Sequence, residues 1–245
     1  MAFVLLFQSG AAVLALSAEQ SQIFHSGISY YSHAKLEPRE PSGNVGGATG
    51  SLAGCDNAQK IWNFFTQDPP KGKGLPAAVA AGFLGNMQEE AHFEPRLVEY
   101  GWPNSRGEIS KAGQPSSLDD DVPPDQNAKG QPGYGIIQWT SPGRKQGLRD
   151  LASSRGVKAG TMEVQMDYLW QELNGAYKNS TLIPLTSDPG ITPRAASEII
   201  TRNYEIPSGM EAAVARRQQH AQHWFNVFST GTYTCGSPGA NTPPQ

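Results

Sequence analysis

Apolar residues repeat at helical spacing through most of this 245-residue chain, and this pattern is the strongest constraint on its fold. One such stripe runs from Met162 to Leu173 and follows Thr161 as a cap. Similar stripes or caps predict further helices: one capped by Asp56, residues 75–92, residues 144–154, one from Pro193 to near Tyr204, and residues 210–228. No convincing alternating strand pattern occurs. We therefore expect one mainly α domain over residues 55–228, with at most a short hairpin between residues 99 and 137.

Glycine (27 residues) and proline (19 residues) are abundant, which indicates long loops or tails beside the helices. Their distribution predicts a leader and flexible linker over residues 19–54 and a disordered tail over residues 229–245. The polar stretch 103–132 reads as a long loop inside the domain. Loops of this length inside a compact domain are usually either functional or disordered.

The apolar stretch over residues 3–16 has the length of a signal-peptide core rather than of a membrane span. It predicts a signal peptide over residues 1–18 and a protein that is secreted or located in the cell envelope. The alternative is an apolar segment that packs locally. The formal net charge of −3 gives no basic surface for nucleic acid. We expect a monomer with no cofactor and no stable membrane span.

The chain contains two cysteines, Cys55 and Cys235. In an exported protein they predict one disulfide that joins the ends of the domain and stabilises it by about 4–5 kcal/mol if unstrained. The alternatives are two unrelated thiols, or a cysteine peptidase in which Cys55 is the nucleophile. The candidate bases for a peptidase, His92, His220 and His223, all lie in predicted helices, and no strand pattern supports that class of fold. His220 and His223 lack an evident third ligand, so we predict no metal site.

Residues 82–95 (GFLGNMQEEAHFEP) place a carboxylate on an apolar helix face. At about 100° per residue, Glu90 falls in line with an apolar stripe, whereas Glu89 falls on the side of two glycines. The stripe consists of Val79, Phe83 and Met87. Burial raises a carboxyl pKa, so such a group can stay protonated near neutral pH and donate a proton in glycoside cleavage. The alternative is a glutamate that pairs with Arg96 or Lys145.

Residues 133–140 (GYGIIQWT) form the second candidate cluster. Its glycines permit a tight turn, while Tyr134, Gln138 and Trp139 supply ring and amide groups that are suited to sugars. The alternative is a buried turn with Trp139 in the core, which is the more frequent role of a single tryptophan.

Residues 203–209 (NYEIPSG) form the third cluster. The pattern predicts a helix end stopped by Pro207, with Tyr204 and Glu205 beside it. Taken alone, this segment indicates a helix terminus and nothing more.

The three clusters, in this order, resemble the phage-tail lysozyme family of the lysozyme-like superfamily. Members carry a G-x-x-G-N-x-x-x-E-S-x-F-x-P helix, a G-x-G-x-x-Q-W turn and a QxxYLxxEL helix. The corresponding segments here are GFLGNMQEEAHFEP, GYGIIQWTSPGRKQGL and QMDYLWQEL, and NYEIP follows. The resemblance covers nearly the whole span from Cys55 to Trp224. The ordered set is specific, whereas any single motif is weak.

The resemblance implies a mainly α (α+β lysozyme-like) fold, with the long loop or a small hairpin beside the active-site cleft. It also implies cleavage of the β-1,4 glycan strand of peptidoglycan between N-acetylmuramic acid and N-acetylglucosamine. The family's catalytic glutamate corresponds to Glu90. Its Gln-Trp turn corresponds to Gln138 and Trp139, which would line the cleft. Tyr204 and Glu205 would lie across it.

Ala91 and His92 depart from the family pattern, which usually has serine and then glycine after the glutamate. If the serine hydroxyl orients the acid, activity is altered or His92 supplies the contact. Retention of Glu90 argues against the alternative of a catalytically weak peptidoglycan-binding module. A hydrolase would also need a second carboxylate, whereas a lytic transglycosylase would use one glutamate and give anhydro-muramic products. We favour hydrolysis. The candidates for the second carboxylate are Glu99, Asp119, Asp120, Asp121 and Glu205.

Overall fold

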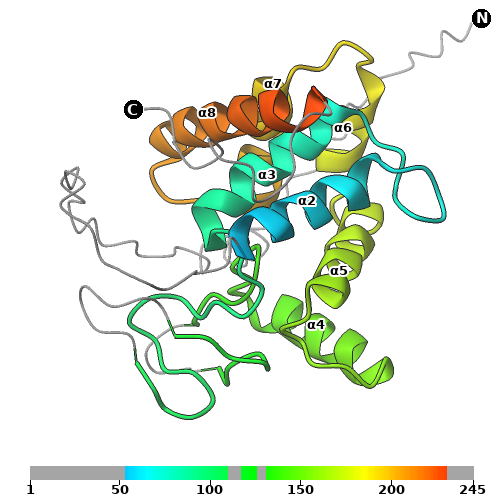
Figure 1. Cartoon of the computed structure of the whole chain (residues 1–245). Coiled ribbons are helices and arrows are strands. Elements are labelled where there is room, and N and C mark those ends of the chain that lie inside the picture. Colours follow the sequence, from blue (N-terminus) through cyan, green and yellow to red (C-terminus); the bar gives the residue numbers. More distant parts are fainter. Residues whose placement is uncertain (1–52, 110–116, 126–130, 231–245) are drawn as a thin grey trace, which may run out of the picture.

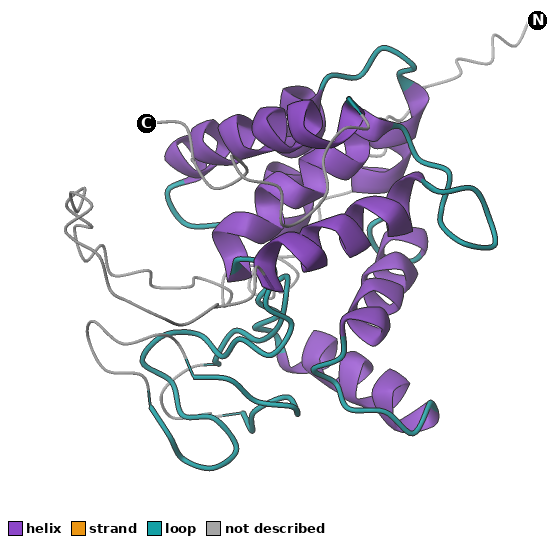
Figure 2. Cartoon of the chain, viewed as in Figure 1, coloured by secondary structure: helices purple, strands orange, loops and turns teal. Residues whose placement is uncertain are grey.

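The computed structural model describes residues 53–109, 117–125 and 131–230 as a single helical domain (Figure 1). These residues form helices and loops, and no strand is present among them (Figure 2). The mainly α prediction is therefore confirmed. In chain order the helices are α2 (Ala53–Thr66), α3 (Ala77–Ala91), α4 (Pro142–Ser154), α5 (Met162–Asn174), the π-helix η1 (Lys178–Leu182), α6 (Ile183–Ser187), α7 (Pro193–Ile200), the π-helix η2 (Thr201–Glu205) and α8 (Met210–Ser229).

Helix α3 is the central helix of the domain and packs against α2, α7 and α8 (Figure 1). Its sequence is rich in alanine and glycine, and its buried residues lie on all sides of the axis. A Cβ on Gly82 would lie 2.9 Å from the Cβ of Ala196 on α7. A Cβ on Gly85 would lie 2.4 Å from the carbonyl oxygen of Arg217 on α8. These two glycines therefore allow the close approach of α7 and α8 to α3.

The core continues from α3 through α2 to α5 and α4. Phe65 of α2 stacks on Phe83 of α3, with ring centroids 4.4 Å apart. Helix α5 contacts both α2 and α4, and Leu148 and Leu169 are fully buried there. Figure 1 shows α2 between α3 and α5, so the domain has a continuous core rather than two separate ones.

The chain between α3 and α4 forms a loop region that is held by isolated β-bridges. The bridges pair Leu97 with Leu118, Val98 with Tyr134, and Pro103 with Ile109. The first two bridges connect the segment that follows α3 to later parts of the loop region, and the third lies within the loop. They lie near the hairpin that the sequence allowed between residues 99 and 137, but they do not extend into strands. Residues 110–116 and 126–130 of this loop lie outside the described residues.

Some boundaries differ from those expected. Helix α2 begins at Ala53, so Asp56 lies in its first turn and is not the N-cap, and the predicted linker to residue 54 overlaps this helix. Helix α8 continues to Ser229, where the tail was expected to begin. Helices η1 and α6 are additional to those predicted, because their sequence, KNSTLIPLTS, is too short for a periodic apolar stripe.

Residues 1–52 and 231–245 lie outside the described part of the chain. The predicted signal peptide, most of the leader and Cys235 fall there. The side chain of Cys55 is also outside the described atoms, so the disulfide stays a prediction. Within the residues that the structure describes, no helix combines the length and apolar character needed to cross a membrane.

Candidate active site

Glu90 lies in the last turn of α3, where this helix contacts α8. Its side chain is 11% exposed, and Oε1 accepts a hydrogen bond from Nη2 of Arg217, whose side chain is 5% exposed. Arg96 and Lys145 pair with other carboxylates. The two partners that the sequence suggested for Glu90, Arg96 and Lys145, were therefore wrong. The arginine that pairs with Glu90 lies on α8, 127 residues further along the chain.

Burial raises the pKa of the Glu90 carboxyl group, and the opposing charge of Arg217 does not cancel this effect. The negative charges of Glu89 and Glu99 raise it further. A raised pKa favours the protonated carboxyl group near neutral pH, which is the form that can donate a proton.

Asn86 holds Arg217 in place from one helical turn before Glu90. Its Oδ1 accepts hydrogen bonds from Nη1 of Arg217 (3.0 Å) and from Oγ1 of Thr201 (2.9 Å). Its Nδ2 donates to main-chain oxygens of α3 and α7 at 2.9 and 3.2 Å. Asn86 has no exposed surface. Its hydrogen bonds to α7 and η2 hold the amide group in place, and the amide group in turn holds the guanidinium of Arg217 beside Glu90.

Glu205 is a second acidic group near Glu90. It ends η2 two residues before Pro207, so the predicted helix end is confirmed. Burial raises the pKa of Glu205 well above its usual range and the charge of Glu90 raises it further, while Arg217 and Arg144 oppose the change. Its Oε1 is buried and has no hydrogen-bond partner among the described residues. This oxygen is therefore an acceptor without a partner in the described residues, on a side chain that lies near enough to Glu90 to be affected by its charge.

Glu172 on α5 accepts hydrogen bonds from three different segments. Oε2 accepts from the Trp139 indole Nε1 (2.9 Å) and from the Tyr204 hydroxyl. Arg144 on α4 donates Nε to Oε1 (2.7 Å) and Nη2 to Oε2 (3.0 Å). The guanidinium of Arg144 also lies 4.7 Å from the centroid of the Tyr204 ring. This largely buried ion pair connects the turn at residues 133–140 to η2.

The turn expected to bind sugars is largely buried. Tyr134 and Trp139 have no exposed surface, and their main chains are joined by two hydrogen bonds of 3.2 and 3.0 Å. The Tyr134 hydroxyl donates to the carbonyl of Asp119 (2.8 Å). These contacts match the buried-turn alternative, in which the aromatic rings pack inside the domain. Gln138 differs, because its Oε1 is buried without a partner in the described residues while its Nε2 donates to the carbonyl of Gly135 (2.9 Å).

The other candidates for a second carboxylate divide into two groups. Glu99 is near enough to raise the pKa of Glu90, and its Oε2 accepts the Gly133 N–H at 2.8 Å. The three aspartates organise the long loop instead: Asp119 accepts the N–H groups of Ser105 and Asp121, Asp120 pairs with Arg96 (3.8 Å), and Asp121 pairs with Lys158 (2.7 Å). The structure therefore brings Glu99 and Glu205 toward Glu90 and uses the aspartates to hold the loop.

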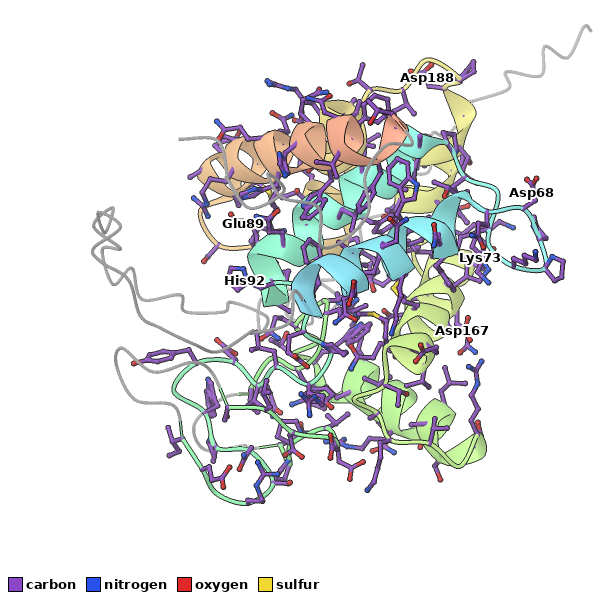
Figure 3. All side chains as sticks on the ribbon, in the orientation of Figure 1. Asp68, Lys73, Glu89, His92, Asp167 and Asp188 are labelled. Atoms are coloured by element: carbon purple, nitrogen blue, oxygen red, sulfur yellow. The ribbon has the colours of Figure 1, made fainter. Side chains whose placement is uncertain are left out.

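Glu89 has the opposite environment from its neighbour Glu90. Figure 3 shows it at the end of α3, on the side of α8. It pairs with Arg216 (3.0 Å) and His220 (2.9 Å). Partial burial would raise the pKa of Glu89, but the hydrogen bonds of His220 and Arg216 outweigh it and lower the pKa to about 2. Glu89 is therefore ionised at neutral pH and cannot serve as a proton donor.

The last features of the site are the possible metal ligands and the two residues that follow Glu90. No group of three or more His, Cys, Asp or Glu side chains in the described ranges is arranged to hold a metal ion. Ala91 is fully buried. His92 ends the helix in a left-handed conformation (φ 48°) and is exposed, as Figure 3 also shows.

Sequence reasoning did not assign roles to Asn86, Arg144, Glu172 or Arg217. Asn86 and Glu172 lie inside the motifs quoted above, so their fixed positions there were a usable signal. Arg144 follows the Gln-Trp turn closely. Arg217 has no comparable local signal, because choosing it over its neighbour Arg216 requires knowing which face of α8 meets α3.

These observations define a class of protein: a mainly helical, lysozyme-like domain whose central helix ends in a buried acid beside a second buried carboxyl group. The sequence model of the phage tail lysozyme family matches residues 56–228, and the chain belongs to this family. Comparison with curated proteins finds no match. Family membership indicates a lysozyme-like enzyme that cleaves peptidoglycan and acts outside the cytoplasm.

Proposed function

We propose that the protein hydrolyses the β-1,4 bond between N-acetylmuramic acid and N-acetylglucosamine in peptidoglycan, with Glu90 as the general acid. The observation that carries this proposal is the burial of Glu90 at the end of α3, which raises the pKa of its carboxyl group. A protonated Glu90 donates its proton to the glycosidic oxygen as the bond between this oxygen and the sugar carbon breaks.

We assign Glu205 as the second carboxylate. The charge of Glu90 raises the pKa of Glu205, so the two acidic groups titrate as a pair that favours one shared proton. While Glu90 holds this proton, its charge no longer adds to the effect of burial on the pKa of Glu205, and the charges of Arg217 and Arg144 favour the ionised form of Glu205. The unpartnered Oε1 of Glu205 is then free to accept a proton from the attacking water or to stabilise positive charge on the sugar.

The remaining site residues have supporting roles in this proposal. We assign Gln138 to substrate binding: its Oε1, which has no partner among the described residues, would accept a hydrogen bond from a hydroxyl or acetamido group of the glycan. Tyr134, Trp139 and Tyr204 are buried, and they act by holding the turn at residues 133–140 and η2 in position.

A lytic transglycosylase is the main alternative, since it needs only one glutamate and closes an anhydro ring on the muramic acid. The second buried carboxyl group favours hydrolysis over this reaction. A peptidoglycan-binding module without activity is disfavoured by the retained, buried Glu90.

The test is mass spectrometry of the muropeptides that the full chain and its Glu90→Gln variant release from purified peptidoglycan. We expect fragments with N-acetylmuramic acid at the reducing end, which disappear in Glu90→Gln. The matched control is Glu89→Gln, which changes the neighbouring carboxylate and should still release these fragments. Fragments with anhydro-muramic ends would show that the protein is a lytic transglycosylase and not a hydrolase. Wall binding without release by the unmodified chain would support the binding module instead.

A further inference from the structure

Arg217 connects the groups of the acidic site. Nη2 of its guanidinium donates to Glu90 and Nη1 donates to Asn86, while Nε is buried without a partner in the described part of the chain. Its charge also opposes the raised pKa of Glu205. One arginine therefore contacts the proposed acid, influences the proposed second carboxylate and is itself anchored to the core.

We infer that Arg217, anchored by Asn86, is a positioning residue that fixes the Glu90 carboxyl group in the active site and offsets the negative charge of the acids around it. This inference rests on the proposed function, in which Glu90 is the proton donor. It assigns Arg217 no contact with the substrate.

The geometry explains how Arg217 can fix a carboxyl group. A guanidinium is planar and presents its donors in a rigid fork, so Nη1 and Nη2 can hold two different acceptors at once. One acceptor, Asn86, is immobilised by hydrogen bonds from α7 and η2. The close contact of Gly85 with the main chain of Arg217 fixes the distance between the two helices. Glu90 is thereby held at one end of a rigid bridge.

The charges around Glu90 explain why a positive group is needed. Glu89 on α3, Glu99 in the loop region and Glu205 at the end of η2 are all acidic. Burial and the charges of Glu89 and Glu99 favour a protonated Glu90, yet a general acid must also release its proton. Arg217 on α8 stabilises the carboxylate that proton donation leaves behind. Without it, Glu90 would remain protonated to a higher pH and would be a weaker acid.

The experiment compares Arg217→Gln with the unmodified full chain. The carbon-13 signal of the Glu90 carboxyl group, assigned by its absence in Glu90→Gln, gives the pKa of Glu90 without substrate. We expect this pKa to rise by about 1–3 units when the positive charge is removed. The alkaline limit of the kcat/KM profile on peptidoglycan should move to higher pH by a similar amount, and kcat should fall by about tenfold or more because the acid is weaker.

Two further variants keep the inference falsifiable. Arg216→Gln changes the adjacent arginine, which pairs with Glu89, and should leave the titration of Glu90 and kcat nearly unchanged. Arg217→Lys keeps the charge but lacks the planar fork that holds Asn86 and Glu90 at the same time, so we expect a smaller rise in the pKa of Glu90. An unmoved Glu90 signal in folded Arg217→Gln would overturn the inference. If Arg217→Gln does not fold, an unmoved signal in Arg217→Lys would do the same.

The two readouts separate this inference from the proposed function. Unchanged release by Glu90→Gln would reject Glu90 as the acid and would remove the basis of the inference. If Glu90→Gln no longer releases fragments but the pKa of Glu90 is unchanged in the Arg217 variants, the inference is rejected and the proposed function is retained.

Discussion

Glu172 and Glu90 are two carboxylates with nearly equal exposure, 10% and 11%, yet their surroundings differ. Glu172 accepts hydrogen bonds from Trp139, Tyr204 and both sides of the Arg144 fork. Among the described residues, Glu90 receives its hydrogen bond from Arg217 alone. A carboxylate whose oxygens are fully occupied holds elements together, whereas one with spare acceptor capacity can react. Burial alone therefore does not identify a catalytic acid.

The largest expected effect is on stability, at Glu172. Glu172→Ala leaves Arg144 buried without its carboxylate and removes the acceptor for Trp139 and Tyr204. We expect the free energy of unfolding to fall by about 3–5 kcal/mol, measured by urea denaturation. Glu163→Ala, an exposed position on the same helix, should change it by less than about 0.5 kcal/mol. Equal losses in the two variants would mean that the Glu172 centre is not structural.

The next effect concerns activity, at Glu205. Glu205→Gln should lower kcat by about 100-fold without lowering stability at pH 7, because its Oε1 has no partner to lose. The folded-state pKa of Glu205 is raised, so its contribution to stability is present below the unfolded pKa and is lost as pH rises through the folded pKa. The stability of the variant relative to the unmodified chain should therefore increase from pH 4 to pH 8. A loss of stability as large as that of Glu172→Ala would mean that Glu205, like Glu172, holds elements of the fold together.

Gly85 tests how tightly the Glu90 centre depends on the contact between α3 and α8. In Gly85→Ala, the new Cβ would meet the Arg217 carbonyl at 2.4 Å and the Ala221 N–H group at 2.7 Å. We expect the free energy of unfolding to fall by about 1–3 kcal/mol, with a decrease in kcat because Arg217 shifts. Gly143→Ala is the matched control, since no atom lies within 4 Å of a Cβ there. A stabilised and fully active Gly85→Ala would show that the helices can separate without consequence.

The smallest effect is expected at Glu89, whose partners are partly exposed. The pKa of Glu89 is about 2 in the folded protein, so its contribution to stability is present above the unfolded pKa and is lost as pH falls from there toward 2. Glu89→Gln should lower the free energy of unfolding by about 1 kcal/mol at pH 7, after allowance for solvent screening. Urea denaturation at pH 7, 5 and 3 should show this difference shrinking. A difference that does not change with pH would argue against the ion pairs.

The sequence by itself determined the helical class of this protein and the position of its proposed acid. Apolar spacing and capping residues act within a few residues of the chain, so α3, α5 and α7 could be predicted closely. Helical spacing also places Glu90 in line with Val79, Phe83 and Met87, so its burial could be predicted from the sequence as well. Short elements such as α6 and the isolated β-bridges of the loop region escaped prediction, because they depend on contacts with distant segments.

Only the tertiary structure decided which groups surround that acid. Glu90 could have been matched with several arginines and lysines, and the choice of Arg217 depends on the rotation of α8 against Gly85. The proximity of Glu205 to Glu90, the burial of Trp139 and the convergence of three segments on Glu172 also depend on how helices far apart in sequence pack. Hydrogen bonds and charges act across space over a few ångströms, and no local pattern encodes which surfaces packing will bring within that range.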